Sequence, residues 1–129
     1  MQINIMISMN KKESREDYLE AILQLSESGK AVRSIDVANH LGFSRPSVSI
    51  AMKKLIADDL ISLGDKGELI LTSKGEEIAR KTFEKHEFLT SCLKKVGVDE
   101  KKAEEIACEI EHSIDEDTFD KVKSYLAKK

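Results

Sequence analysis

Residues 107–113 read ACEIEHS and place a thiol, a carboxylate and an imidazole at Cys108, Glu111 and His112. The three positions are i, i+3 and i+4, which share one face of a helix. Thiolates, carboxylates and imidazoles all bind divalent metal ions, so the spacing predicts a metal site. The alternative is that the thiol belongs to the core and that the Glu-His pair is only solvated surface, because both are common. The other motifs of the sequence distinguish between a metal site and this alternative.

The composition indicates a mostly helical protein. The chain has 129 residues, enough for one domain or for two small lobes that share an interface, and its 40% hydrophobic content supports a real core. Charged residues make up 35%, there is one Pro and no Trp, and apolar positions recur at helical spacing. We therefore expect a mostly α fold with little sheet.

The N-terminal segment MQINIMIS is the longest apolar run near the start. It is too short to cross a bilayer and lacks the basic flank and cleavage pattern of a secretory signal, and Met9 is a plausible start. We expect a cytoplasmic protein with no membrane partner. In that reducing compartment Cys92 and Cys108 are expected to be free thiols or ligands and not a disulfide.

The charge is unevenly distributed along the chain. The formal net charge is -3, but residues 99–120 alone carry ten Asp or Glu against two Lys. The first 98 residues are therefore close to neutral or slightly basic, and the acidic balance is local. It does not argue against a nucleic-acid partner for the N-terminal part.

The N-terminal elements have the spacing of a helix-turn-helix. A first helix is predicted from a Ser14 cap to Gly29, and an acid such as Asp17 in its first turn could simply interact with the helix dipole. Short and longer helices follow over 34–41 and 45–57, joined by a three-residue turn that contains Gly. Ser34 and Ser44 are predicted to cap them.

The remaining chain predicts a wing and then a helical lobe. Two β-prone runs surround residues 64–67, which predicts a hairpin with a basic tip. Ser73, followed by Glu76, is predicted to cap a long helix that extends to about Val96. Asp99 and Asp115 are predicted to cap two further helices. We expect a winged helix-turn-helix domain over 10–72 and a helical metal-binding and dimerisation domain over 73–129.

The second helix of the helix-turn-helix has the residues of a DNA-reading element. Residues 44–57 contain three cations and no acid, with small hydroxyl side chains near the N-terminal end. Val48, Ala51, Met52 and Leu55 are assigned to the core instead. Few phosphate contacts are available per subunit, so a homodimer on double-stranded DNA is expected; the alternative is a winged helix that contacts protein. The predicted DNA-binding residues are Ser44, Arg45, Pro46, Ser47, Ser49, Lys53, Lys54 and, at the wing, Lys66.

Four segments together resemble one known family. REDYLEAI, the winged helix ending in LTSKG, KHEFL in the long helix, and CEIEH near the C-terminus are similar in order and spacing to the diphtheria toxin repressor and manganese transport regulator family of metal-activated repressors. The likeness spans roughly residues 13 to 127. It implies a transcriptional repressor, not an enzyme, that binds Fe²⁺ or Mn²⁺ between its DNA-binding and dimerisation parts. The positions that match family ligands are Asp17, Glu20, His86, Cys108, Glu111 and His112.

The chain departs from both branches of this family. Cys108 matches the iron-type members, whereas Asp17 matches the manganese type. Glu104 stands where iron-type members place a His of a second, ancillary site, and Thr90 stands where they have Glu. A second site would be built on His86 and Glu104. We expect no counterpart of the third domain that the longer iron-type members have.

The identity of the bound metal ion is inferred from its ligand atoms. A thiolate favours Fe²⁺ over Mn²⁺, the carboxylates suit Mn²⁺, and we lean to Fe²⁺; Zn²⁺, Co²⁺ or Ni²⁺ should bind in vitro. The expected function is metal-dependent repression, most simply of metal-uptake genes. A metal-independent winged-helix regulator is the main alternative. A metallohydrolase is a second alternative, but the sequence indicates no separate general base and no substrate cleft for one. We expect no small organic substrate.

Overall fold

The computed structural model describes residues 15–128, and they form two compact units. One unit reaches residue 81 and the other begins at residue 82, so that the division falls within the long helix α4, Ser73–Lys95. The proposed domain boundary between residues 72 and 73, at the start of α4, stays a prediction. None of the helices described is both long and apolar enough to cross a membrane.

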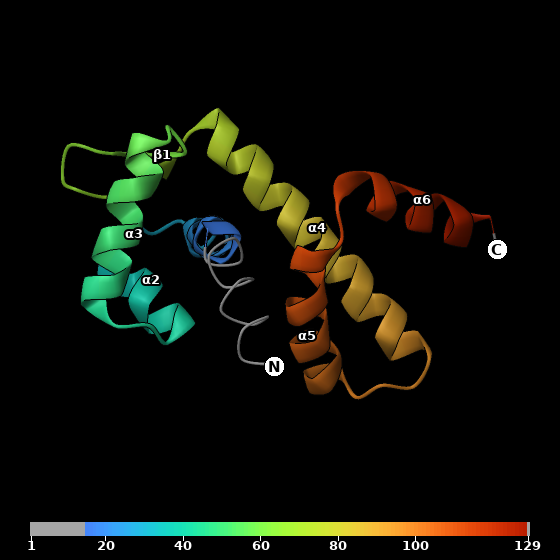
Figure 1. The fold of residues 1–129 in the computed structure, drawn as a ribbon. Coiled ribbons are helices and arrows are strands. Elements are labelled where there is room, and N and C mark those ends of the chain that lie inside the picture. The colour runs from blue at the N-terminus through green and yellow to red at the C-terminus, as the bar shows by residue number, and fades with distance from the viewer. Residues whose placement is uncertain (1–14, 129) are drawn as a thin grey trace, which may run out of the picture. The chain divides into compact units, whose positions relative to one another are not determined.

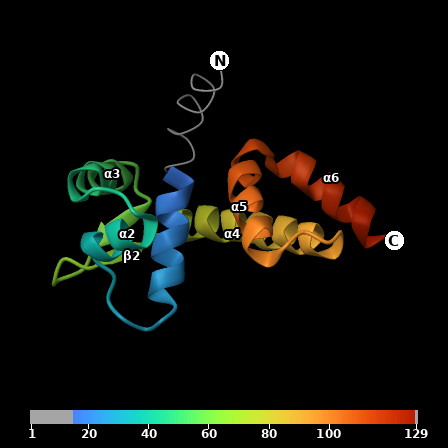
Figure 2. The same ribbon diagram turned by 90° about the horizontal axis from the view of Figure 1, so that it is seen from below.

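The first unit is a helix-turn-helix followed by a two-stranded hairpin. Its first helix is described over 15–26, and the predicted Ser14 cap lies outside the described residues. The helices α2, Ser34–Leu41, and α3, Arg45–Ala57, come next, and the strands β1, Ile61–Leu63, and β2, Leu69–Leu71, pair antiparallel. Figures 1 and 2 show α2 and α3 with the hairpin in this unit. The mostly α fold with a small β-hairpin wing is confirmed.

Local hydrogen bonds explain where the helices begin. The Ser44 side chain caps α3 by accepting from the backbone N–H of Ser47, as predicted. The other two Ser predictions were wrong by one residue. The residue before α2 is Arg33, whose backbone N–H donates to the Asp36 carboxylate at 2.9 Å, and α4 is capped by Thr72, whose hydroxyl accepts from a backbone N–H three residues later.

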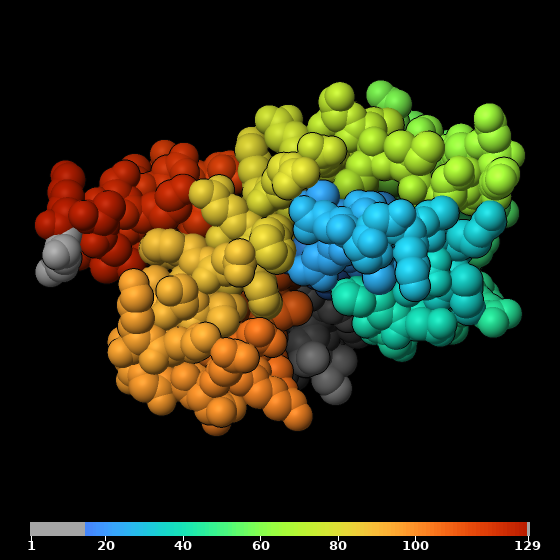
Figure 3. Space-filling model, turned by 180° about the vertical axis from the view of Figure 1, so that it is seen from behind, coloured from blue at the N-terminus to red at the C-terminus, as the bar shows by residue number. Residues whose placement is uncertain are grey.

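A single apolar core holds the first unit together. It combines the inner faces of the first helix, α2 and α3 with residues of the hairpin and the start of α4. Figure 3 shows one face of the unit, where the segment leading to α2, in cyan, covers much of the blue first helix. The core positions predicted for α3 are confirmed: Val48, Met52 and Leu55 are buried, and Ala51 packs against the cluster.

The join between α3, the hairpin and α4 depends on close backbone contacts. α3 ends at Ala57, Asp59 two residues later has a positive φ of 61°, and the N–H of Leu60 returns to the carbonyl of Leu55. The Thr72 hydroxyl donates to the Asp59 carbonyl at 2.8 Å. A Cβ at Gly75 would overlap with the carbonyl oxygen of Leu60, so only Gly allows α4 to start this close to the hairpin.

The second unit contains the rest of α4 and the helices α5, Glu100–Ile110, η1, Glu111–Ser113, and α6, Glu116–Ala127. Asp99 caps α5 and Asp115 caps α6, each by accepting from a backbone N–H, as predicted. Phe119 of α6 is buried and meets Phe88 of α4 edge to face, with ring centroids 5.4 Å apart. α5 lies beside the second half of α4 in both ribbon views (Figures 1 and 2).

Candidate metal centre and DNA-facing helix

The segment with the predicted metal ligands is not one continuous α-helix. α5 ends at Ile110, and Glu111 and His112 lie in the 3₁₀ turn η1, whereas the sequence predicts a helix through about His112. Helices commonly tighten in this way at their C-terminal ends. Ile114 then becomes extended, which lets Asp115 cap α6.

The Glu111 carboxylate is the buried centre of this segment. Glu111 is 1% exposed. One carboxylate oxygen lies 3.2 Å from Nδ1 of His86 on α4, and the other lies 3.5 Å from Nε2 of His112. A buried carboxylate needs such partners, because burial without them would be costly. The two imidazole rings therefore each lie against one oxygen of this buried carboxyl group inside the second unit.

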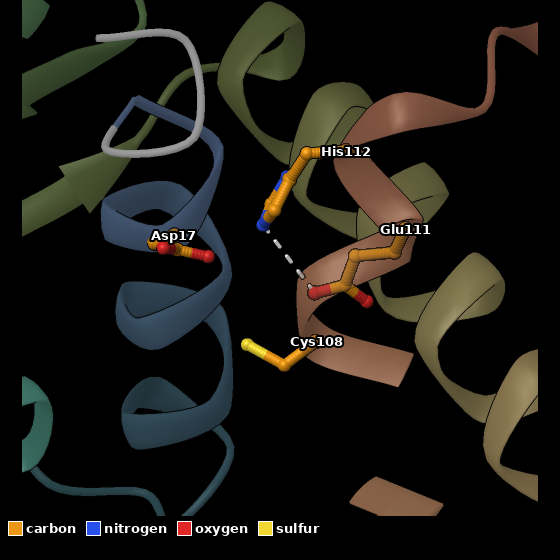
Figure 4. Close-up of side chains that lie close together, drawn as sticks. All are labelled: Asp17, Cys108, Glu111 and His112. Carbon is orange, nitrogen blue, oxygen red and sulfur yellow. Dashed lines mark ion pairs between the residues drawn. The ribbon is translucent and has the colours of Figure 1, made fainter. Parts of the chain in front are cut away.

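Cys108, Glu111 and His112 converge within the second unit. One ligand atom from each of the three lies within 4.8 Å of the others. Figure 4 shows their side chains extending from α5 and η1, with the dashed ion pair between His112 and Glu111. Cys108 is exposed, so solvent reaches the thiol side of the group. A sulfur, an oxygen and a nitrogen donor at this spacing fit a divalent transition-metal ion.

Lys85 positions the turn and was missed by the sequence reasoning. Its ammonium group donates to the carbonyl oxygen of Ile114 at 2.7 Å and lies 4.0 Å from the Glu116 carboxylate. The contact joins α4 to the backbone that follows η1, and so helps to fix the direction in which Glu111 and His112 project. No sequence pattern indicates it, because the partners are 29 residues apart.

The residues expected for a second site line one cavity between α4 and α5. His86 and Glu104 both border a space of about 370 Å³, together with Thr90 and Lys94. The Lys94 ammonium group donates a hydrogen bond to the Glu100 carboxylate at 2.8 Å, and this hydrogen bond raises the pKa of Lys94. His86 and Glu104 thus line the same cavity, and their role as metal ligands stays a prediction.

Asp17 and Glu20 belong to the first unit. Both lie in the first helix, where Glu20 is 8% exposed and Asp17 is half-buried. Figure 4 labels Asp17 on that helix. Burial raises the pKa of the neighbouring Tyr18, and the negative charge of Asp17 raises it further. The part these two carboxylates play in a metal site is considered under the proposed function.

The predicted DNA-facing side chains lie on the outside of the first unit. The residues predicted on α3 and at its cap, Ser44, Arg45, Pro46, Ser47, Ser49, Lys53 and Lys54, are all exposed. Ile50 is exposed among them, and the sequence reasoning did not assign it; its position opposite Val48 and Met52 on a helical wheel could have indicated this.

The wing tip is held by a small hydrogen-bonded turn. Lys66 is exposed there, as a basic wing tip requires, and its backbone N–H donates to the Glu68 carboxylate at 2.9 Å. Hydrogen bonds from the backbone N–H groups of Glu68 itself and of Lys66 lower the pKa of Glu68. The carboxylate thus shapes the turn through the backbone of Lys66, and a phosphate contact of the Lys66 ammonium group stays a prediction.

Comparison with known families finds two adjoining matches. Residues 12–68 match the family described as "Iron dependent repressor, N-terminal DNA binding domain". Residues 72–128 match "Iron dependent repressor, metal binding and dimerisation domain". Together the two matches cover nearly the whole chain. They support a metal-dependent regulator and give no support to the metal-independent alternative.

Individual relatives agree with these matches. The transcriptional regulator MntR of Escherichia coli O157:H7 is 30% identical over 119 residues, which are 92% of this chain and 77% of that one. The HTH-type transcriptional regulator MntR of Bacillus subtilis is 34% identical over 109 residues, 84% and 77% of the two chains. An HTH-type transcriptional regulator of Methanocaldococcus jannaschii is 31% identical over 118 residues, 90% and 94% of the two chains.

Solved structures show the same fold. The manganese regulator SloR superposes with a TM-score of 0.77 at 26% identity, and IdeR of T. acidophilum with 0.75 at 25%. The matches cover 88% and 87% of this chain but only 53% of each of those chains, so this chain spans about half of their length. The family regulates transcription and does not consist of enzymes, as the sequence also indicated. The chain belongs to the diphtheria toxin repressor and manganese transport regulator family of metal-dependent transcriptional repressors.

Proposed function

We propose that this protein is a repressor whose DNA binding is switched on by a divalent metal ion held at Cys108, Glu111 and His112. The observation that carries the proposal is the buried Glu111 carboxylate, which has His112 and Cys108 within 4.8 Å in the same unit. A buried anion next to an exposed thiol and an imidazole is a donor set suited to a cation. Its regulated genes would most simply be those for metal uptake, and it would act in the cytoplasm, where its DNA lies.

The ligand set would be completed from the first helix. Asp17 and Glu20 match family ligand positions, and they offer two carboxylates three residues apart on a helix, where side chains share a face. Three ligands from one unit leave positions open around the ion, which an oxygen from the other unit can fill. Coordination by both units would make DNA binding depend on metal.

His86 has a separate part in the proposal. Its Nδ1 contacts the carboxylate oxygen of Glu111 that faces away from His112. His86 would therefore orient Glu111 for the first ion, in the way that outer partners orient metal ligands. With Glu104 across the 370 Å³ cavity it could also hold a second ion.

One ligand, the thiolate of Cys108, favours Fe²⁺ over Mn²⁺. A thiolate such as that of Cys108 prefers softer or later ions, whereas the carboxylates of Asp17, Glu20 and Glu111 suit Mn²⁺. The relatives named for manganese argue in the other direction. We propose Fe²⁺ as the physiological ion and Mn²⁺ as a competent substitute, with Zn²⁺, Co²⁺ and Ni²⁺ binding in vitro.

The coupling energy required is within reach of a metal site. Without a cation, the carboxylates of Asp17 and Glu20 would repel that of Glu111, which opposes their meeting. Moving a two-state population from 1:99 to 99:1 takes about 5.5 kcal/mol of differential affinity. Structural zinc sites in peptides provide roughly 10 to 16 kcal/mol. A weaker, exchangeable site would still cover much of the requirement.

The active species would be a homodimer formed through the helical unit. Between the second half of α4 and α6 lies a largely apolar groove of about 620 Å³, bordered by Phe88, Cys92, Val96 and Leu126. Val96 is 78% exposed, so the single chain leaves apolar surface uncovered at this place. A second copy that covers this surface would double the phosphate contacts of one winged helix.

The experiment is a metal titration of DNA binding. Purified protein without metal is incubated with a random-sequence duplex library, and Mn²⁺ is added while bound DNA is selected and sequenced. The proposal expects a two-fold symmetric sequence to be enriched only with metal. Enrichment that is equal without metal would support a metal-independent regulator, and the absence of any enriched DNA would contradict the repressor function.

A further inference from the structure

The outward face of α3 contains one large apolar side chain that residues 15–128 leave largely uncovered. Ile50 is 66% exposed. The buried residues of α3, Val48, Met52 and Leu55, recur at i, i+4 and i+7 and so define its inner face. Ile50 follows Val48 by two positions, which is about 200° around an α-helix. It therefore lies diametrically opposite the core.

The neighbours of Ile50 on this face are those of a DNA-contacting surface. Pro46 and Ser47 precede it by four and three positions, Lys53 and Lys54 follow it by three and four, and all four are exposed. The two lysines thus flank Ile50 on either side. No acid occurs between residues 44 and 57, so the face can approach phosphates without repulsion.

Exposure alone would prove little, since single apolar residues are common on surfaces. The position of Ile50 is what limits its partner. A helix that enters the major groove presents its outward face to base edges, and the C5 methyl group of thymine is the apolar group that this groove offers. Guanine, adenine and cytosine present no methyl group in this groove, so isoleucine, which has no hydrogen-bonding group, finds a methyl partner only at thymine.

We propose that Ile50 is a specificity-determining residue that selects thymine by packing against its C5 methyl group. The inference rests on the proposed DNA-binding function and adds the base that this position reads. Burial of one methyl-sized group corresponds to about a fourfold change in affinity. A symmetric dimer has two such contacts, so loss of both should weaken binding by roughly fifteenfold if the two contribute independently.

The test uses the DNA sequence selected by the metal-loaded wild-type protein. Each symmetric pair of thymines in that sequence is replaced by deoxyuridine, which lacks only the methyl group, and affinity is measured by fluorescence anisotropy with Mn²⁺. One pair should show the roughly fifteenfold loss with wild type. The variant Ile50→Ala should bind the thymine site more weakly and lose no more affinity with deoxyuridine, whereas Ile50→Val should retain much of the difference.

Two controls separate this contact from general effects. Ile56→Ala removes another exposed isoleucine of α3, which lies away from the outward face, and should keep the full deoxyuridine penalty. Placing 5-methylcytosine instead of cytosine at the same position should improve binding by wild type and not by Ile50→Ala. The far-ultraviolet circular dichroism and melting temperature of Ile50→Ala should match wild type, because the side chain is exposed.

The possible failures are distinct. If metal enriches no DNA sequence, the proposed function fails and this inference falls with it. If a sequence is enriched but no deoxyuridine pair weakens wild-type binding, Ile50 reads no methyl group and could instead contact protein. If the penalty persists unchanged in Ile50→Ala, another residue reads the thymine. Either of the last two results overturns the assignment while leaving the repressor function intact.

Discussion

Replacing Glu111 by Gln should remove most of the stabilisation that metal gives to the protein. The change keeps the shape of the side chain but deletes the buried negative charge that lies 3.2 Å from His86 and 3.5 Å from His112. A neutral amide is a poor ligand for a divalent cation. Loss of even an outer partner typically costs 10- to 100-fold in metal affinity, so about 100-fold is a conservative value for a direct ligand.

The size of the effect follows from linkage. At a Mn²⁺ concentration about 100 times the wild-type dissociation constant, binding stabilises the folded state by about 2.7 kcal/mol. A 100-fold weaker site would be half-saturated there and would contribute only about 0.4 kcal/mol. For a chain of 129 residues, 1 kcal/mol shifts the melting temperature by roughly 3 to 5 °C. The metal-induced shift should therefore fall from roughly 8–13 °C to about 1–2 °C.

The assay is thermal unfolding followed by circular dichroism, with and without Mn²⁺, for wild type and for Glu111→Gln. Each protein's metal-free melting temperature is its own baseline, which separates metal affinity from intrinsic stability. Glu105→Gln is the matched control, because it changes an exposed acid of α5 and should leave the metal-induced shift intact. A shift in Glu111→Gln equal to that of wild type would refute the placement of the ion at Glu111.

Four further predictions concern the fold, the DNA contact and the pH dependence of the metal switch. Asp59→Gly should stabilise the protein by about 0.5–1 kcal/mol in urea unfolding, because Gly adopts a positive φ without strain; a loss of stability would contradict this. Gly75→Ala should destabilise by about 1–3 kcal/mol in the same assay, since the new methyl group meets the Leu60 carbonyl, and an unchanged midpoint would count against that close contact. Lys54→Ala should reduce the slope of log affinity against log salt by about 1.8 for a dimer, and an unchanged slope would show that this lysine meets no phosphate. Metal-dependent DNA binding should weaken as pH is lowered through about 6.5, because a ligand such as His112 must be unprotonated; binding at subsaturating metal that is constant from pH 8 to 5.5 would oppose its role.

The parts of the fold that depend on local sequence could be predicted. Ser44 was identified as a cap because a hydroxyl before a helix that has Pro in its first turn is a local signal, and the apolar spacing of Val48, Met52 and Leu55 marked the core face of α3. The caps assigned to Ser34 and Ser73 were each one residue late. At α4 the adjacent Thr72 has its own hydroxyl, which donates to the Asp59 carbonyl ahead of the hairpin and accepts from the backbone N–H of Gly75.

The parts that depend on distant contacts could not be predicted. The sequence gives no reason for the helix to tighten at Glu111, since Lys85 of α4 is what holds the Ile114 carbonyl beyond the turn. The burial of Glu111 and its contact with His86 likewise depend on the packing of α5 beside α4. The residue types of the centre were visible in the sequence, whereas the partner that orients its carboxylate was not.

A cobalt titration tests the metal switch most directly. Co²⁺ bound by a thiolate has a near-ultraviolet charge-transfer band, so absorbance can follow occupancy of the Cys108 site while fluorescence anisotropy follows the selected DNA in the same sample. We expect the two signals to rise together in wild type. Asp17→Asn should retain the thiolate band and lose DNA binding, because the bound ion loses the carboxylate ligand from the first helix. DNA binding that is complete before any cobalt is bound, or that Asp17→Asn leaves unchanged, would contradict the account.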